Sequence, residues 1–350
     1  MIVCFDIGGT TMKGGYARAV EDINVLERVP TPGRDFDAFV GVLARAIANC
    51  PAPPRALAAA IPGIIEPGSG LGVVANVPCI SGIPVRERLE AALGLPVALA
   101  NDADCFALAE VAVGAGRGHR VVLGIILGTG VGGGLVIDGR LINAEGGFAG
   151  EWGHGPVAAR LAGTPVVEIP RFRCGCGLSG CLDATVSARG MEALHRHLHG
   201  KEATSLAIVA GWEAGEAEPV RTIAIWLEIA AAPLAMLVNT TAADIIPVGG
   251  GLGGSTALIA ALDAAVRPLT LRRFDRPLVV RAQCRVEPGL VGAAWLGFAS
   301  LRCDAGAFAP GEASLMTDRM RDGTARKRVD GSPPPRPTIP RKGALRGRCS

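Results

Sequence analysis

Apolar residues along this chain gather in short runs that alternate with longer stretches of helical spacing. The first run, residues 2–7, ends at Gly8-Gly9-Thr10-Thr11, and the chain resumes as a strand at residues 14–16. The same order returns as residues 121–127, a glycine-rich turn and residues 135–137. Short apolar runs bounded by glycine are typical of strands. Each half is therefore predicted to open with a β-hairpin, and we interpret the repetition as an internal duplication.

Strands and helices alternate along the rest of the chain. The further strands are expected at residues 56–61, 97–100, 244–248 and 278–281. Helices are expected at residues 35–49, 85–93, 103–113, 187–199, 205–214, 219–239, 256–266 and 289–301. This alternation predicts an α/β fold with two domains, residues 1–115 and 116–301. From Arg302 the periodicity stops, and the basic, proline-rich segment 302–350 is expected to be a disordered tail.

Composition and charge exclude several classes of function. The formal net charge is +3, but residues 302–350 hold 11 Lys/Arg against 5 Asp/Glu, which leaves −3 on residues 1–301. The body therefore lacks the basic footprint of a nucleic-acid-binding protein. No apolar run reaches the roughly 18 residues of a membrane span, and the first residues lack the basic start of a signal peptide. Seven of the ten cysteines are scattered singly, so a reducing cytoplasm is expected.

Three glycine-rich segments are candidates for phosphate binding. The residues concerned are Asp6, Gly8, Gly9, Thr10 and Thr11; Gly128, Thr129, Gly130, Gly132, Gly133 and Gly134; and Gly249, Gly250 and Gly251. Glycine lets backbone N–H groups approach phosphate oxygens closely, and threonine hydroxyls add donors. A single glycine turn is more simply a tight hairpin. Because two equivalent turns and a third glycine run occur together, nucleotide phosphate binding is favoured, in a fold other than the P-loop.

Asn101-Asp102 follows the predicted strand 97–100 and precedes a predicted helix. One interpretation is that Asp102 caps the helix. The other places its carboxylate at the carboxyl end of a sheet, where α/β folds bind ligands. A hydroxyl that accepts a phosphoryl group needs a base to align it and take its proton. With glycine turns on either side, the catalytic interpretation of Asp102 is favoured.

A cluster of thiols with one imidazole predicts a structural zinc site within residues 151–185. Cys174, Cys176 and Cys181 are separated by glycines, and His154 lies upstream. Three thiolates and one imidazole fill the four positions of a tetrahedral zinc ion. The same stretch carries Glu151 and Asp183. Zinc is therefore expected to brace a polar pocket beside the nucleotide site, as in a kinase for a small polyol.

These motifs together resemble the ROK family of sugar kinases and sugar-responsive repressors, over nearly all of residues 1–301. The matching motifs are Asp6-x-Gly8-Gly9-Thr10, Asn101-Asp102-Ala103, Gly128-Thr129-Gly130-x-Gly132-Gly133-Gly134, Gly150-Glu151-x-Gly153-His154, Cys174-x-Cys176-Gly177-x-x-Gly180-Cys181 and Gly249-Gly250-Gly251. Within the family, Ala75-Asn76-Val77-Pro78 and the long spacer between His154 and Cys174 are similar to the members that phosphorylate N-acetyl-D-glucosamine.

The resemblance implies an actin/hexokinase-like (ribonuclease H-like) fold, with ATP and Mg²⁺ between two domains that close on the sugar. It implies that Asp102 is the base on the sugar 6-hydroxyl. The sugar ligands would be Asn76, Asn101, Asp102, Glu151, His154 and Asp183, and the zinc ligands His154, Cys174, Cys176 and Cys181. The glycine turns would hold phosphates, with Asp6 near the metal. A cytoplasmic homodimer that phosphorylates N-acetyl-D-glucosamine is expected.

Two residues depart from the family pattern. Thr11 stands where the family usually has lysine, so nucleotide affinity is lower or Lys13 substitutes. Asp183 stands where the family has glutamate, and its reach toward the sugar is shorter by one methylene. Glucose, N-acetylmannosamine and fructose are alternative substrates. A non-catalytic sugar sensor is the alternative of another class, although a first strand at residue 2 leaves no room for a repressor's DNA-binding domain.

Overall fold

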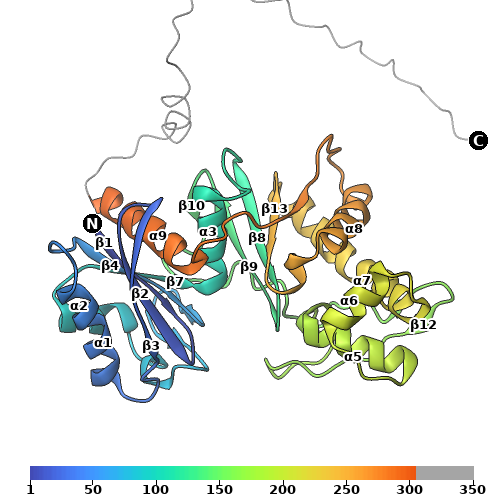
Figure 1. Cartoon of the computed structure of the whole chain (residues 1–350), viewed down its shortest axis with the longest axis horizontal. Helices are drawn as coiled ribbons and strands as arrows, with labels where there is room; N and C mark the ends of the chain where they lie inside the picture. Colours follow the sequence, from blue (N-terminus) through green and yellow to red (C-terminus); the bar gives the residue numbers. More distant parts are fainter. Residues whose placement is uncertain (305–350) are drawn as a thin grey trace, which may run out of the picture.

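Each of the two predicted hairpins grows into a five-stranded mixed sheet. The computed structural model describes residues 1–304, and Figure 1 shows the two sheets side by side. The first sheet has the order β3-β2-β1-β4-β7: β1 (Ile2–Ile7), β2 (Thr11–Ala19), β3 (Asp22–Pro30), β4 (Ala56–Ile61) and β7 (Val97–Asn101). The second has the order β10-β9-β8-β13-β14: β8 (Val121–Leu127), β9 (Val131–Ile137), β10 (Arg140–Leu141), β13 (Ile246–Gly249) and β14 (Val279–Arg281).

The two sheets share one topology. In each, the first two strands pair antiparallel, and the first strand also pairs in parallel with a later strand, β1 with β4 and β8 with β13. A further parallel strand follows at the edge, β7 in one sheet and β14 in the other. The predicted duplication and the predicted α/β fold are therefore confirmed.

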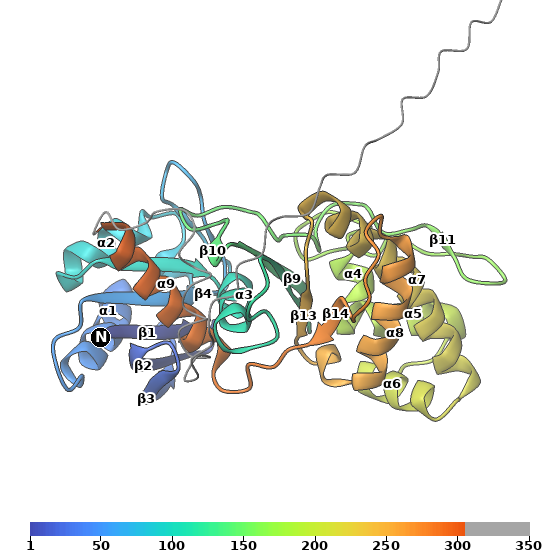
Figure 2. The ribbon, with the colours of Figure 1, turned by 90° about the horizontal axis from the view of Figure 1, so that it is seen from above.

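Helices cover both faces of the sheets, as Figure 2 shows from above. In the first half they are α1 (Phe36–Ala48), α2 (Val85–Leu93) and α3 (Asp102–Val113), with the short strands β5 (Ile64–Ile65) and β6 (Gly72–Val73) and the 3₁₀ helix η1 (Pro78–Ile80). In the second half they are α4 (Asp183–Val186), α5 (Ala188–His199), α6 (Ser205–Glu213), α7 (Ala217–Thr241), α8 (Thr256–Val266) and α9 (Pro288–Asp304), with β11 (Leu161–Ala162), β12 (Val167–Glu168), η2 (Leu252–Gly254) and η3 (Arg267–Leu269).

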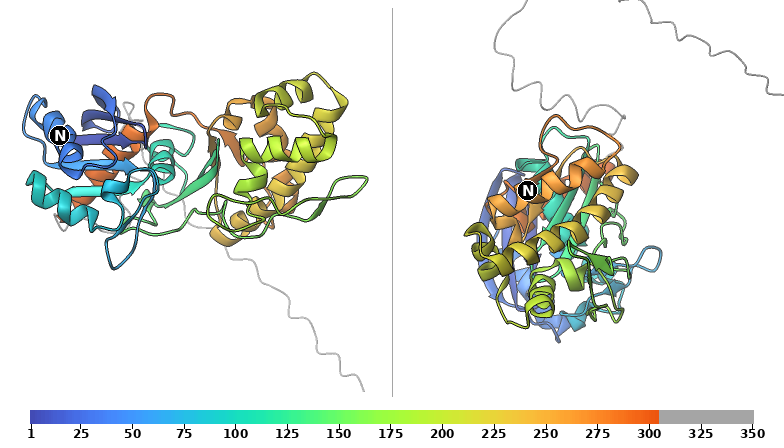
Figure 3. Two further views of the ribbon diagram at one scale, coloured as in Figure 1. Left: turned by 90° about the horizontal axis from the view of Figure 1, so that it is seen from below. Right: turned by 90° about the vertical axis from the view of Figure 1, so that its right-hand side faces the viewer.

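Helices α3 and α9 each pack on the sheet of the other half of the chain. α3 belongs to the first half of the sequence, yet it packs on β8 and β9 of the second sheet as well as on α9. α9 comes from the second half and packs on β1, β4 and β7 of the first sheet, a return that Figure 3 (left) shows as the segment crossing between the halves. The helix expected at residues 289–301 therefore lies on the sheet of residues 1–115, not on that of its own half.

Small residues allow this close return. Alanine makes up four of the six residues of strand β4 (ALAAAI), which is buried along its whole length. A side chain at Gly297 would lie 2.7 Å from Ile2 and 3.0 Å from the Ala58 Cβ, and one at Gly292 would overlap the backbone of Cys105 on α3. The missing side chains let α9 approach both the sheet and α3, since packed interiors tolerate no overlap. One apolar cluster consequently runs from the first sheet through α3 and α9 to the second.

Several element boundaries differ from the sequence prediction. The second strand spans Thr11–Ala19, and an edge strand, Asp22–Pro30, was not predicted. The last helix runs to Asp304, so Arg302 lies in it, whereas residues 305–350 of the expected tail lie outside the described residues. Helix α7 is long and apolar enough to cross a membrane, but it packs among α5, α6 and α8 as the central helix of the second half. The buried Trp226 is one of its core residues.

Candidate active site

The strand β7 delivers Asn101 and Asp102 to the carboxyl end of the first sheet. The cap of helix α3 is Asn101, and not Asp102, which was the cap considered from the sequence. The Asn101 Oδ1 accepts the Ala103 N–H at 2.8 Å, and its Nδ2 donates to the Gly63 carbonyl at 3.0 Å. Asp102 is the first residue of α3, and its Oδ1 also lies 2.8 Å from the Ala103 nitrogen. Asp102 is solvent-accessible as a residue, so a ligand can reach it from outside.

The carboxylates of Asp6 and Glu151, which come from different elements, are close enough to Asp102 to affect its pKa. Protein atoms surround much of its carboxyl group, and this desolvation raises its pKa. The Ala103 N–H acts in the opposite direction, while the negative charges of Asp6 and Glu151 raise the pKa further. The structure thus brings together three residues that the sequence places about 50 or more positions apart. A carboxylate with a raised pKa beside other oxygen ligands suits a general base near a divalent cation.

Asp6 on β1 lies directly opposite Lys13 on β2 in the register of the sheet. The Lys13 ammonium is 3.8 Å from Asp6 Oδ2 and 2.7 Å from Glu287 Oε2. Burial raises the pKa of Asp6, Lys13 lowers it, and Glu287 raises it. Of the two positions weighed from the sequence, Lys13 is therefore the one that carries positive charge to Asp6. Glu287 was not predicted, because a lone glutamate in a turn before a helix carries no motif.

The first glycine turn is closed by its own backbone. The Gly8 N–H donates to the Thr11 carbonyl at 2.8 Å, and the Thr31 hydroxyl donates to the Gly8 carbonyl at 2.6 Å. Gly9, Thr10 and Thr11 are exposed. A side chain at Gly9 would lie 2.7 Å from the Asn76 Cβ, so Asn76 borders this turn. The arrangement leaves N–H groups and hydroxyls open to a phosphate.

The second glycine turn consists of Gly128, Thr129 and Gly130, and the third glycine run lies against it. Gly250 has a φ of 80°, and a side chain there would overlap the Leu127 carbonyl. Two contacts hold the second turn to the following segments: Ala188 N–H donates to the Gly128 carbonyl at 2.8 Å, and Val131 N–H donates to Asp183 Oδ1 at 2.7 Å.

Gly132, Gly133 and Gly134 differ from the prediction, because they lie within strand β9 and not in the turn. A side chain at Gly134 would come within 2.9 Å of the Ala103 carbonyl and of Asp104 on α3. One at Gly133 would come within 3.2 Å of the Gly150 carbonyl. These glycines therefore let α3 and the segment before Glu151 pack against the strand, and their part in phosphate binding stays a prediction.

Glu151 and His154 extend from the loop that follows β10. Trp152 between them is buried, and its Nε1 donates to the Gly132 carbonyl at 3.0 Å, which fixes the loop on β9. Glu151 Oε2 lies 3.7 Å from His154 Nε2. The other ring nitrogen of His154, Nδ1, faces the cysteines. One imidazole therefore connects the polar pocket with the thiol cluster.

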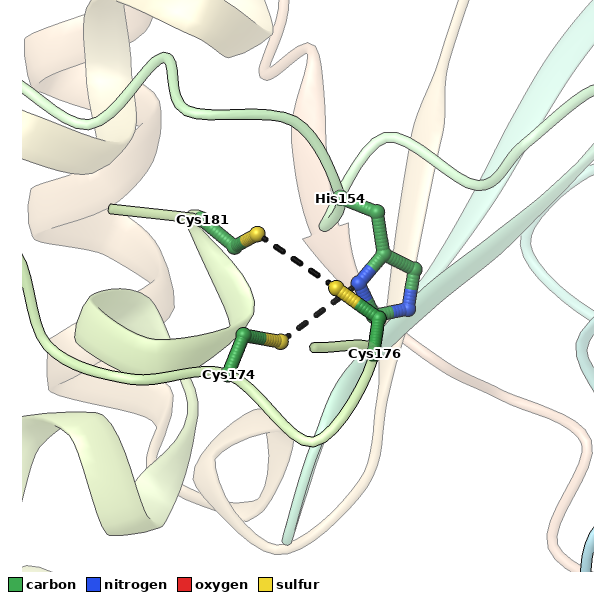
Figure 4. Close-up of side chains that lie close together, drawn as sticks. All are labelled: His154, Cys174, Cys176 and Cys181. Atoms are coloured by element: carbon green, nitrogen blue, oxygen red, sulfur yellow. Dashed lines mark hydrogen bonds between the residues drawn. The ribbon is translucent and has the colours of Figure 1, made fainter. Parts of the chain in front are cut away.

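The thiol cluster forms as predicted, and two of its donor–donor distances match the edges of a tetrahedral zinc site. The four donor atoms of His154, Cys174, Cys176 and Cys181 lie within 4.8 Å of one another (Figure 4). Cys174 Sγ is 3.6 Å from His154 Nδ1, and the sulfurs of Cys176 and Cys181 are 3.7 Å apart. Zn–S bonds of about 2.3 Å and Zn–N bonds of about 2.0 Å give tetrahedral edges of about 3.5–3.8 Å. The Leu178 N–H lowers the pKa of Cys176 to about 7, which favours the thiolate form that binds metal.

Asp183 makes contacts with both the cysteine loop and the second glycine turn. Its Oδ1 accepts the Val131 N–H of the second turn, and its Oδ2 is 3.5 Å from the sulfur of Cys174. Its own N–H donates to the Gly153 carbonyl at 2.8 Å. The carboxylate thus joins the cysteine loop to the second glycine turn.

Comparison with known proteins gives one consistent result. A model of the ROK family matches residues 2–299. The chain is 35% identical to the N-acetylgalactosamine kinase AgaK of Shewanella sp. (strain ANA-3), over 83% of this chain and 95% of that one. It is 33% identical to an N-acetyl-D-glucosamine kinase of Salmonella heidelberg (strain SL476), over 83% and 97%. A ROK family glucokinase from Streptomyces griseus, solved with glucose and AMPPNP, superimposes with a TM-score of 0.60 at 27% identity, over 84% and 97%.

Proposed function

Since the chain belongs to the ROK family and is a sugar kinase, we propose that it transfers the γ-phosphoryl group of ATP to the 6-hydroxyl of N-acetyl-D-glucosamine. The observation that carries the proposal is the position of Asp102. Its carboxylate lies in the field of two other carboxylates, Asp6, which we assign to the phosphate side, and Glu151, which we assign to the sugar side. A base between a phosphoryl donor and an acceptor hydroxyl is what this transfer needs.

In the proposed reaction Asp102 accepts a hydrogen bond from the sugar 6-hydroxyl and aligns its oxygen with the γ-phosphorus. The oxygen attacks in line, the bond to the β–γ bridging oxygen breaks, and ADP leaves. The hydroxyl proton passes to the Asp102 carboxylate. Its raised pKa makes that carboxylate a better proton acceptor than an ordinary aspartate. The Ala103 N–H holds one carboxylate oxygen in place during the step.

The phosphates of ATP are assigned to the two glycine turns. The exposed backbone of Gly9, Thr10 and Thr11 and the second turn at Gly128–Gly130 offer donors from the two halves. Asp6 would hold the magnesium ion that accompanies ATP, which neutralises charge on the transferring group. Lys13 is placed beside Asp6 to add positive charge there.

The sugar is assigned to the polar groups around Asp102. Asn76 borders the first turn, and Glu151 and His154 face the same space from the second half. Asn101 keeps one amide hydrogen beyond its helix-cap contacts. Zinc at His154 and the three cysteines would be structural, because all four positions are filled by protein atoms. A homodimer in the cytoplasm stays our expectation for the assembly and its location.

The test is an assay that couples ADP release to a readable signal, with ATP, Mg²⁺ and a panel of sugars. The panel holds N-acetyl-D-glucosamine, N-acetylgalactosamine, N-acetylmannosamine, glucose and fructose. We expect the highest kcat/KM with N-acetyl-D-glucosamine. Asp102→Asn should lower kcat at least about 10³-fold while titration calorimetry still detects sugar binding. Turnover that survives in Asp102→Asn would contradict the assignment of the base.

The second candidate substrate is N-acetylgalactosamine, because the relative at 35% identity is named for it. The two sugars differ only in the configuration at carbon 4, so the ratio of their kcat/KM values separates them directly. Binding of sugar and of an ATP analogue without turnover on any member of the panel would instead favour the non-catalytic sensor.

A further inference from the structure

A buried polar pair that no motif contains lies between α3 and the loop that leads to Glu151. Asp104 on α3 is 2% exposed and Asn143 is 6% exposed. Asn143 Nδ2 donates to Asp104 Oδ2 at 3.1 Å and lies 3.3 Å from Oδ1. Buried side chains of this kind are costly unless their contacts are made. Their presence beside the pocket therefore needs an explanation beyond packing.

The Asn143 side chain forms hydrogen bonds with the backbone of Ala149, two residues before Glu151. Its Nδ2 donates to the Ala149 carbonyl at 2.7 Å, and its Oδ1 accepts the Ala149 N–H at 3.2 Å. The two hydrogens of the amide are thus shared between Ala149 and Asp104. Whatever fixes the Asn143 side chain fixes the loop at Ala149.

Two glycines in the loop allow Asn143 to approach the backbone of Ala149. Gly147 has a φ of 145°, and a side chain there would lie 2.6 Å from Asn143 Oδ1. Gly146 has a φ of 88°, and a side chain there would press on Ile65 of β5. The Gly147 N–H donates to the Ile65 carbonyl at 3.1 Å. The loop therefore rests against the first half, although it emerges from a strand of the second.

Asp104 and Asp102 lie two residues apart on α3, so they point to opposite sides of the helix. Asp102 lies in the field of Asp6 and Glu151, and Asp104 accepts a hydrogen bond from Asn143. The position of the base and the position of the loop are therefore set by one rigid element.

We propose that Asp104 and Asn143 are positioning residues, which anchor the loop 143–150 to α3 and so set the distance between Asp102 and the sugar-binding side chains Glu151 and His154. The functional part of this inference rests on the proposed sugar kinase activity. The anchoring part does not, because it concerns only the loop. The pair touches neither substrate nor nucleotide in this scheme.

The protonation state of Asp104 adds a supporting detail. Burial raises its pKa to about 7, the Asn143 hydrogen bond lowers it, and the charges of Glu151 and Asp102 raise it. A neutral side chain at this position is thus compatible with the fold near pH 7. Asp104→Asn keeps an oxygen for Asn143 and removes the charge, so it is the conservative variant, whereas Asp104→Ala removes the acceptor.

The experiment compares wild type, Asp104→Asn and Asp104→Ala in two measurements. Amide hydrogen exchange over residues 143–150 reports the anchoring without any ligand. We expect about tenfold faster exchange in Asp104→Ala and near-wild-type exchange in Asp104→Asn. Steady-state kinetics should then show KM for N-acetyl-D-glucosamine raised about tenfold in Asp104→Ala, with KM for ATP and kcat within about twofold.

The matched control is Asp263→Ala, which removes another buried carboxylate. Asp263 accepts the N–H groups of Leu278 and Val279 between α8 and β14. We expect this variant to lose stability while exchange over 143–150 and the sugar KM stay at wild-type values. If Asp104→Ala does not fold, Asn143→Ser, which is too short to span Ala149 and Asp104, carries the same expectation.

Unchanged exchange over 143–150 in Asp104→Ala overturns the anchoring. Faster exchange with an unchanged sugar KM, or with equal rises in the KM values of sugar and ATP, overturns the positioning role. Absence of turnover by the wild type on the whole panel contradicts the proposed function alone, because the exchange measurement still decides the anchoring.

Discussion

The two glycine turns occupy equivalent places in two sheets of the same topology, yet their surroundings differ. The first turn lies beside charged side chains, since Lys13 sits between Asp6 and Glu287. Within residues 1–304, the second turn is held by the Ala188 N–H and by the carboxylate of Asp183, which joins it to the cysteine loop. The duplicated topology thus determines where each turn lies, while the neighbouring segments determine which groups surround it. We infer that the first turn contributes charged side chains to nucleotide binding, whereas the second contributes a backbone that is held in a fixed position.

The largest effect that separates the two turns is expected at Asp6. Asp6→Asn keeps the size of the side chain but removes the charge assigned to the magnesium ion. We expect kcat to fall about 10²–10³-fold with sugar affinity unchanged. Steady-state kinetics across a range of Mg²⁺ concentrations would check this. A normal kcat at ordinary Mg²⁺ would show that the first turn does not act through Asp6.

A substitution in the predicted zinc site tests the second turn, and we expect its effect on activity to be as large as that of Asp6→Asn or slightly smaller. Cys181→Ser takes away a buried thiol that we expect to bind zinc, and the loop that carries Asp183 and Glu151 should loosen. We expect loss of bound zinc by elemental analysis and a fall in kcat/KM of about 10–100-fold. The thermal unfolding midpoint should also fall. Full retention of zinc and of the midpoint would mean that the cluster is not a metal site.

Asp183→Ala breaks the link between the second turn and the cysteine loop without touching a cysteine. We expect affinity for an ATP analogue to weaken about tenfold in titration calorimetry, because Val131 loses its acceptor. Sugar affinity should stay the same. Asp183→Asn, which keeps an acceptor oxygen, is the matched control. If the sugar affinity falls instead, Asp183 is a sugar ligand, as the family resemblance implies.

Lys13→Met should have the smallest effect, about three- to fivefold on KM for ATP. Lys13 lowers the pKa of Asp6, so its removal leaves that pKa higher. Because the Asp6 carboxylate must be ionised to hold a cation, activity should be lost at a higher pH on acidification than in wild type. The pH profile of kcat/KM for ATP checks this sign. A shift in the opposite direction would separate Lys13 from Asp6.

The fold was predictable where burial leaves a simple pattern. The strand–glycine–strand units and the helices between them have strong periodicity, and the structure confirms them. The edge strand Asp22–Pro30 was missed because it is at most half-buried, so its polar and apolar positions do not alternate cleanly. The placement of α9 could not be predicted, since it depends on contacts between residues such as Gly297 and Ile2 at opposite ends of the chain.

The candidate site was predictable wherever chemistry follows a motif. His154 and the three cysteines lie together as the motif indicated, and Asp102 lies in the electrostatic field of Asp6 and Glu151. Glu287 and Asn143 gave no signal, because each is a single polar residue in a turn whose role depends on a distant partner. The close packing at Gly132, Gly133 and Gly134 gave no separate signal, since glycine for packing and glycine for phosphate are alike in sequence.

The return of α9 to the first sheet has a consequence for the order in which the protein is made. The ribosome releases strands β1, β4 and β7 long before the helix that covers them. Until then the alanine-lined face of that sheet lacks its cover, and exposed apolar surface favours association with other chains. The N-terminal half therefore completes its core only after α9 has been made, and the synthesis of α9, more than the folding of β1, β4 and β7, should set when that half becomes native.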